Sequence, residues 1–181
     1  MISHFDSDHS SNAKEVLENL KVKNIIISKQ VEKSNEFEEI LKIVNKKQVN
    51  IVEVQSGDII SIDKDVYFKI LWPDINNIVD KNTLNNNSIV AKLCYKEFSM
   101  LFTGDIEEIA EKEIVRRCEE KGLSSTILKV AHHGSATSTK EKFLEEVKPR
   151  VALIGVGKNN QFGHPNKNVI ERLQNSRCKC L

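Results

Sequence analysis

The sequence contains no apolar run that approaches the roughly 20 residues needed to cross a membrane as a helix. Residues 1–6 have neither the basic start nor the apolar stretch of a signal peptide. These absences predict a cytoplasmic protein, or an extracytoplasmic one if the chain belongs to a larger membrane protein.

Cysteine is also scarce, and the spacing of Cys94, Cys118, Cys178 and Cys180 fits neither a zinc ribbon nor a disulfide framework. Cys178 and Cys180 could bind a metal or oxidise, but we favour a frayed terminal pair of free thiols. Free thiols indicate a reducing compartment.

An excess of either charge is missing as well, because 27 basic and 26 acidic residues leave a net charge of +1. This balance excludes an overall basic field for nucleic acid, but not a local basic patch. The 39% hydrophobic and 29% charged residues are typical of a globular rather than a disordered chain. Because 181 residues can fold without disulfides, residues 1–181 are expected to form a single domain.

The hydrophobic periodicity predicts helices and short strands around a central β meander. The predicted helices are 12–21, 34–47, 106–121, 139–147 and 166–175, and the predicted strands are 23–28, 50–54, 59–62, 66–71, 89–95, 98–102, 126–131 and 151–156. The asparagine-rich stretch 74–87 is expected to be a loop. Together these elements predict sheets covered by helices, an α/β layered domain.

Three of these helices carry local signals. Ser34 is predicted to cap the helix 34–47. In the other two, the residues predicted to face inward are Val16, Leu17 and Leu20 in 12–21, and Ile109, Ala110, Ile114 and Val115 in 106–121.

A first group of candidate ligands lies at the N-terminus: His4, Asp6, Asp8 and His9. If residues 3–8 are extended, the side chains of His4, Asp6 and Asp8 share one face, because strand side chains alternate. Carboxylates this close repel one another unless a cation holds them. A solvated acidic terminus is the alternative, and the cluster alone does not decide between the two.

Three further candidates follow predicted strands. Asp105 comes just after the apolar residues 100–102 and could point into a cleft and bridge two cations, or cap a helix that begins at Ile106. His132 and His133 follow the strand 126–131; on an extended chain only one of them would face the site. His164 lies in the loop before the helix 166–175, where a lone histidine is more often structural or exposed.

Taken together, these segments place histidine and aspartate ligands in four separate loops of one small chain. Two divalent ions held by such ligands would activate water at neutral pH and polarise a phosphoryl or acyl oxygen. The many carboxylates favour manganese or magnesium, while zinc remains an option.

The order of these motifs resembles that of the metallo-β-lactamase superfamily, and within it the hydrolase domain of ComEC-type DNA-uptake proteins and their stand-alone relatives. The matching segments are His4-Phe5-Asp6-Ser7-Asp8-His9, Asn87-Ser88, Thr103-Gly104-Asp105, Leu128 to Ser135 and Gly163-His164-Pro165. The resemblance covers nearly the whole chain. Family members have several strands before the first motif, which here begins close to Met1, so the resemblance implies an αββα sandwich that lacks its first strands.

The resemblance also implies a set of roles. The implied metal ligands are His4, Asp6, Asp8, His9, Asp105 and His164, with Asp105 bridging two ions. Asp8, His132 and His133 are the implied catalytic residues, one of the two histidines serving as a ligand or proton donor. The implied activity is phosphodiester hydrolysis, with DNA as the nucleic-acid substrate.

Two other hypotheses stay open at this point. The scaffold also hosts hydrolases of small esters, lactones and phosphoesters, because fold alone does not determine chemistry. The alternative to an enzyme is a non-catalytic remnant of the fold. Bound metal would argue against this alternative.

Overall fold

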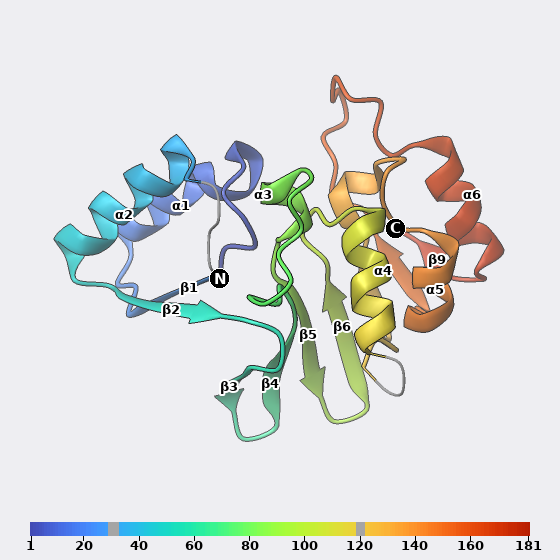
Figure 1. Ribbon diagram of the computed structural model, residues 1–181, viewed down its shortest axis with the longest axis horizontal. Helices are drawn as coiled ribbons and strands as arrows, with labels where there is room; N and C mark the ends of the chain where they lie inside the picture. Colours follow the sequence, from blue (N-terminus) through green and yellow to red (C-terminus); the bar gives the residue numbers. More distant parts are fainter. Residues whose placement is uncertain (29–32, 119–121) are drawn as a thin grey trace.

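The computed structural model describes residues 1–28, 33–118 and 122–181. Within these residues, two sheets lie between two layers of helices (Figure 1). Helices α1 (Ser7–Asn19) and α2 (Asn35–Lys47) cover a small parallel sheet of β1 (Asn24–Ser28) and β2 (Asn50–Val54). The layered α/β architecture predicted from the sequence is therefore confirmed.

The larger sheet has, among the described residues, seven strands in the order β3-β4-β5-β6-β7-β8-β9. Its antiparallel half is the meander of β3 (Ile59–Asp63), β4 (Val66–Trp72), β5 (Val90–Tyr95) and β6 (Phe98–Phe102). Its parallel half adds β7 (Ile127–Lys129), β8 (Val151–Leu153) and β9 (Lys179–Cys180). The parallel strands are connected by α4 (Glu108–Arg117), α5 (Glu141–Val147) and α6 (Lys167–Asn175), which cover the sheet.

Apolar clusters between the layers hold the fold together. The main cluster packs the large sheet against α4–α6, and Leu101, Ile114 and Leu128 are fully buried in it. A second cluster fills the space between α1, α2 and β1. A third, which includes Val54 and Ile70, joins the two sheets face to face. Burial of this kind is the main driving force of folding.

The topology brings distant segments to one edge of the large sheet. Because β6, β7 and β8 are parallel, their carboxyl ends share that edge, and the loops that follow them meet there. The N-terminal segment runs between the two sheets: Ile2 N–H donates to the Ile26 carbonyl at 2.9 Å, and Ile89 N–H donates to the Ser3 carbonyl at 2.9 Å. These bonds bring the first residues of the chain to the same edge.

Several local predictions are confirmed. Ser34 Oγ accepts the Phe37 N–H at 3.2 Å and caps α2. The strands β5 and β6 form a hairpin across residues 96–97, as part of the predicted β meander. The predicted strands 126–131 and 151–156 are present but shorter, because the chain leaves the sheet at the loops that follow β7 and β8.

The prediction for the first helix was wrong in two respects. α1 begins at Ser7 rather than at residue 12, because the chain turns into helix directly after the extended Asp6. Polar residues fill the added turn, so the apolar pattern carried no signal for it. Leu17 is buried, but Val16 and Leu20 are 46% and 63% exposed.

The region around α4 also departs from the prediction. α4 is shorter than the predicted helix 106–121, and residues 119–121 lie outside the described residues. Ala110, Ile114 and Val115 face inward as predicted, but Ile109 is 39% exposed. The stretch 74–87 is not a simple loop, because it includes α3 (Thr83–Asn86) and buried asparagines that replace regular backbone pairing with side-chain hydrogen bonds.

The C-terminal cysteines are not frayed. Cys178 is buried in the main apolar cluster, and β9 pairs with β8 in parallel. The sulfur of Cys178 donates to the Leu173 carbonyl at 3.2 Å. Among the described residues, no helix combines the length and the apolar character needed to cross a bilayer.

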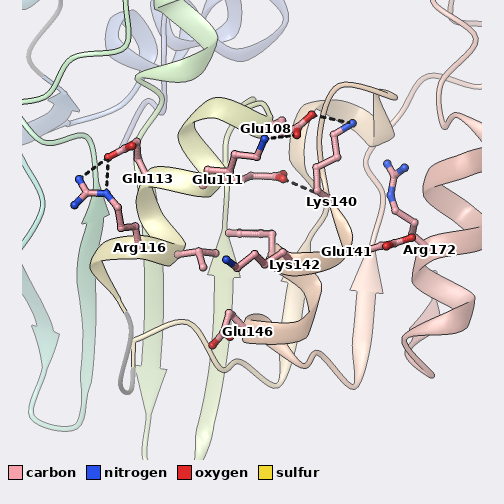
Figure 2. A pocket seen from close by; sticks show the side chains of 12 residues that line it. Glu108, Glu111, Glu113, Arg116, Lys140, Glu141, Lys142, Glu146 and Arg172 are labelled. Carbon is pink, nitrogen blue, oxygen red and sulfur yellow. Dashed lines mark hydrogen bonds and ion pairs between the residues drawn. The ribbon is translucent and has the colours of Figure 1, made fainter.

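Residues of α4 and α5 line a groove of about 610 Å³, and the buried carboxylate of Glu111 is among its lining groups (Figure 2). Glu111 is 1% exposed and accepts the backbone N–H groups of Thr139 and Lys140, the latter at 2.9 Å. Arg172 Nε donates to the Thr139 carbonyl at 2.9 Å, so α4, α5 and α6 are linked here. Burial raises the pKa of Glu111 to about 7, although the two backbone N–H groups oppose that shift.

This raised pKa predicts that stability falls as the pH rises between about 4.5 and 7. In that window the unfolded chain releases the proton of Glu111 while the folded chain keeps it, so the free energy of unfolding decreases with pH. The full loss is about 3 kcal/mol, from roughly 2.5 pKa units. Denaturant titrations at pH 5, 6, 7 and 8 should show that Glu111→Gln removes this part of the slope. Equal slopes in both proteins would contradict the prediction.

Candidate metal centre

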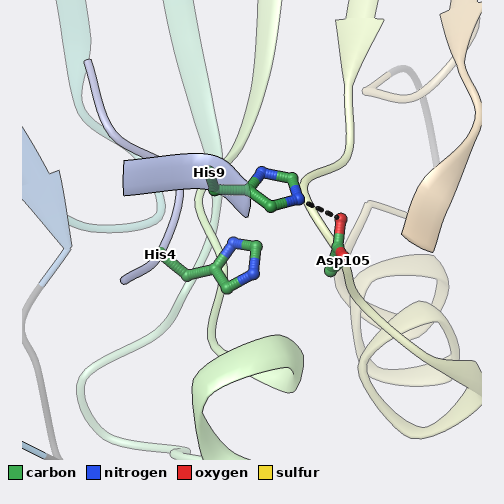
Figure 3. Close-up of side chains that lie close together, drawn as sticks. All are labelled: His4, His9 and Asp105. Atoms are coloured by element: carbon green, nitrogen blue, oxygen red, sulfur yellow. Dashed lines mark ion pairs between the residues drawn. The ribbon is translucent and has the colours of Figure 1, made fainter. Parts of the chain in front are cut away.

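Asp105 lies at the centre of the site, in the loop that follows β6 (Figure 3). It is 3% exposed, and its backbone N–H donates to Ser88 Oγ at 3.2 Å. Two backbone hydrogen bonds join the neighbouring loops: His132 N–H donates to the Gly104 carbonyl at 3.2 Å, and Asn166 N–H donates to the Gly134 carbonyl at 2.8 Å. The site is therefore built on loops that are fixed to one another.

Imidazole rings surround the Asp105 carboxylate. His9 Nε2 lies 3.1 Å from Oδ1, and His133 Nε2 and His132 Nε2 lie 3.5 Å and 3.9 Å from Oδ2. Burial alone would raise the pKa of Asp105, but His133 and His9 outweigh it and hold that pKa far below its usual range. The same pairing raises the pKa of His133. Asp105 therefore stays ionised in this buried site.

His133 is held in a defined orientation. Its Nδ1 lies 2.6 Å from the Gly155 carbonyl, which can only accept a hydrogen bond, so Nδ1 carries a proton and donates it in that bond. Nε2 is then the ring nitrogen that faces Asp8 Oδ2, 3.1 Å away, and Asp105. A backbone carbonyl in this position is the usual partner of a metal-binding histidine.

Several buried ring nitrogens point at no hydrogen-bond partner. In the described part of the chain these include His4 Nε2, His132 Nδ1 and His164 Nδ1. His9 Nε2 and His133 Nε2 lie 3.0 Å apart, within hydrogen-bond distance of each other, so these two nitrogens converge on the same point. Buried polar atoms normally have partners. Nitrogen lone pairs and ionised carboxylates that converge without partners fit a divalent cation.

Two groups of ligand atoms are close enough to hold an ion, each with its atoms within 4.8 Å of one another. One is His4, His9 and Asp105, and the other is Asp8, His9 and His133. Together they draw on the N-terminal segment, the loop after β6 and the loop after β7. The two groups share His9.

The remaining predicted residues lie around these groups. Asp6 Oδ2 is 3.7 Å from His4 Nε2, and the His132 and His164 rings are 5.8 Å apart. Asp6, His132 and His164 line a cleft of about 610 Å³ together with Asp8, Asp105 and His133. The structure therefore brings every predicted site residue to one place, although Asp6, His132 and His164 belong to neither close group.

Two expectations about local geometry were wrong. Asp8 and His9 belong to the first turn of α1, so residues 3–8 do not alternate as a strand. His132 and His133 form a short 3₁₀ segment, η1 (Ala131–Gly134), in which both have positive φ, 48° and 53°. Because the chain turns instead of running extended, both histidines face Asp105. Positive φ is rare in residues other than glycine and often marks a functional site.

The sequence profile described as "Metallo-beta-lactamase superfamily" matches residues 1–158. The chain belongs to this superfamily. Over its full length it is 34% identical to ComE operon protein 3 of Bacillus subtilis (strain 168), of which it covers 23%. It is also 31% identical over 116 residues to the competence protein ComA of Neisseria gonorrhoeae, covering 16% of that protein. The chain thus spans at most about a quarter of these relatives.

A solved structure supports the superfamily fold. The diiron β-hydroxylase CmlA from Streptomyces venezuelae matches with a TM-score of 0.62 over 98% of this chain and 42% of that protein. The sequence identity is 11%, so the likeness extends to the fold alone. The expected metallo-β-lactamase-like fold is confirmed by the profile and by this match.

Two residues that border the candidate metal centre were not predicted from the sequence. Glu107 is the N-cap residue of α4, and its Oε1 lies 3.8 Å from His132 Nδ1. Asn86 holds Glu107 in place, since its Oδ1 accepts the Glu107 N–H at 2.9 Å and its Nδ2 donates to Glu107 Oε2 at 3.2 Å. Asn86 lies 21 residues earlier and Glu107 reads as a surface helix residue, so no local signal in the sequence identifies the pair.

Lys129, the last residue of β7, is partly buried beside this candidate centre. Its Nζ donates to the Val130 carbonyl at 2.9 Å. Burial lowers the pKa of Lys129, and the negative charges of Asp105 and Asp8 oppose that shift.

Gly104 is required by the close approach of the loop to Ser88. A Cβ on Gly104 would lie 2.5 Å from Ser88 Cβ, and Gly104 has φ +52°. Gly104→Ala is therefore expected to lower the free energy of unfolding by about 1–3 kcal/mol and to weaken metal binding, because Ser88 also positions Asp105. Denaturant titration and calorimetric metal titration measure both effects. Gly163→Ala is the matched control, since φ is +67° there but no atom lies within 4 Å; an equal loss in both variants would contradict the role of Ser88.

Proposed function

We propose that this chain is a metal-dependent hydrolase that cleaves phosphodiester bonds, with DNA as the substrate. The observation that carries the proposal is the buried, ionised Asp105, whose carboxylate is faced by the Nε2 atoms of three histidines. Buried ring nitrogens without hydrogen-bond partners lie beside it, on His4, His132 and His164. A buried negative charge is costly unless it is paired. A bound divalent ion would pair with this charge and take up the free ring nitrogens, so the ligand set favours metal binding.

The proposed ligands are the six predicted from the sequence together with His133: His4, Asp6, Asp8, His9, Asp105, His133 and His164. Because one ring nitrogen binds one ion, His9 can serve as a ligand in only one of the two close groups. Asp105 has two carboxylate oxygens directed at different histidines, which supports a bridging role between two ions. The imidazole nitrogens of this set suit zinc, and its carboxylate oxygens suit manganese and magnesium.

The chemistry divides between ions and side chains. Bound divalent ions would supply an activated water and polarise the scissile phosphoryl group. His132 faces the same cleft, with Glu107 behind its Nδ1, and is proposed to donate a proton to the leaving oxygen. Asp8, whose side chain is 60% exposed at the cleft, is proposed to orient the attacking water. The ammonium group of Lys129 balances the negative charge of the site.

The choice of substrate draws on the relatives and on the cleft. One relative is named a competence protein and another, from Haemophilus influenzae, is named Recombination protein 2. Because recombination acts on DNA, we propose DNA as the substrate. The cleft is open at Asp8 and Gly155, both exposed, so a polymer could cross it.

Hydrolysis of a small ester, lactone or phosphoester is the second candidate, and the net charge of +1 favours it over a polyanion. The two differ in salt dependence: DNA binding should weaken steeply with salt, while binding of a neutral ester should not. A protein that binds no ions after addition of manganese or zinc would instead be a non-catalytic member of the fold.

The test compares wild type, Asp8→Ala and Asp105→Ala on single-stranded and double-stranded DNA with manganese and with zinc. We expect wild type to degrade DNA and both variants to lose that activity. Elemental analysis of the same samples reports how many ions each protein holds. Equal DNA degradation by all three proteins would reject the proposed site.

A further inference from the structure

Phe162 is an exposed aromatic residue on the rim of the metal cleft. It is 82% exposed, more than any other large hydrophobic side chain in the described residues. It lines the same cleft as Asp8, Asp105 and His133. Leaving a phenyl ring in water sacrifices the free energy that its burial would contribute, about 1.5–3 kcal/mol.

The position of Phe162 is imposed by its loop. Asn160 Oδ1 accepts the N–H groups of Phe162 and His164, at 3.2 Å and 2.9 Å. Asn160 Nδ2 donates to the carbonyls of Gly157 and His164, at 2.9 Å and 2.7 Å. The Asn160 side chain thus links the residues before it to those after it and fixes the backbone of the loop. In this fixed loop the Phe162 ring points away from the core.

The ring presents a flat surface beside the site. Its plane lies 23° from that of His164, with the ring centroids 5.8 Å apart. The adjacent cleft wall consists of Gly155, Val156 and Gly157, which leaves room for a planar group to approach. Lys158, in the same loop, is exposed and can meet a phosphate.

We propose that Phe162 is a stacking subsite for a nucleobase of single-stranded nucleic acid, placed one or a few nucleotides from the scissile phosphate. This inference rests on the proposed phosphodiesterase function and names its substrate class. An aromatic face accepts any base, because every base has a π surface. Bases in a duplex are already stacked, so only an unpaired strand can offer a base to Phe162.

Binding of fluorescent 12-nucleotide DNA to the metal-free full chain, in chelator, separates recognition from cleavage. The probes are a single strand with bases, an abasic strand with the same phosphates, and a duplex. Phe162→Leu is expected to weaken binding of the base-bearing strand by about 5- to 100-fold and leave the abasic strand and the duplex unchanged. Phe162→Trp should retain binding.

Phe98→Leu is the matched control, since Phe98 is a partly exposed phenylalanine on the β5–β6 hairpin, away from the cleft. Equal weakening of the base-bearing and abasic strands by Phe162→Leu would overturn the proposal, as would no weakening or no wild-type binding of the base-bearing strand. Base-dependent binding without DNA cleavage in the metal-loaded protein would instead support the subsite and reject the proposed hydrolysis.

Discussion

Asp105→Asn is expected to reduce metal-dependent hydrolysis by at least about 1,000-fold, because metal ions contribute several kcal/mol to such reactions. Asparagine keeps the shape and one oxygen of the side chain but removes the negative charge. Asp105 is the carboxylate that faces His9 at 3.1 Å and His133 at 3.5 Å, so its charge organises the whole ligand set. Without that charge, the remaining nitrogens hold an ion only weakly.

The measurements are hydrolysis rates and metal content by elemental analysis on the same preparation. Asp65→Asn is the matched control, because Asp65 is an exposed aspartate in the β3–β4 turn. The control should keep both activity and metal. Retention of the full metal content by Asp105→Asn would show that Asp105 is not a ligand, even if activity fell.

Trp72→Ala is expected to have the largest effect on stability, a loss of about 3–5 kcal/mol in the free energy of unfolding. Trp72 is fully buried at the end of β4, and its Nε1–H donates to the Asn86 carbonyl at 2.7 Å. The Arg117 guanidinium lies 5.9 Å from the ring centroid. The alanine variant would leave a cavity and an unpaired buried carbonyl.

Denaturant titration measures this loss, and Trp72→Phe divides it into its parts. Phenylalanine keeps an aromatic ring in the core but removes the N–H donor, so it should cost about 1–3 kcal/mol, the penalty of an unsatisfied buried acceptor. Ile59→Ala, at a 65% exposed position, should change stability by less than about 0.5 kcal/mol. A Trp72→Ala loss as small as that of Ile59→Ala would contradict the predicted role of this core.

Trp72 also bears on the metal centre. Its partner Asn86 holds Glu107, which lies behind His132. A chain of contacts thus runs from β4 of the large sheet through α3 and the start of α4 to His132.

Predictions from local pattern succeeded where local physics decides the outcome. The Ser34 cap and the hairpin at residues 96–97 are each set by residues a few positions apart. Predictions from local pattern failed where contacts between distant segments determine the structure. The start of α1 at Ser7, the exposure of Ile109 and the burial of Cys178 depend on which surfaces the other elements cover.

The sequence by itself determined the layered α/β fold and the set of residues that gather around Asp105, because hydrophobic periodicity and motif order are properties of the chain. Only the tertiary structure decided how those residues face one another. The positive φ of His132 and His133, and the placement of Glu107 behind His132, follow from loops that meet at the shared carboxyl edge of β6, β7 and β8. Such geometry arises from contacts between segments far apart in the chain, and no local pattern encodes it.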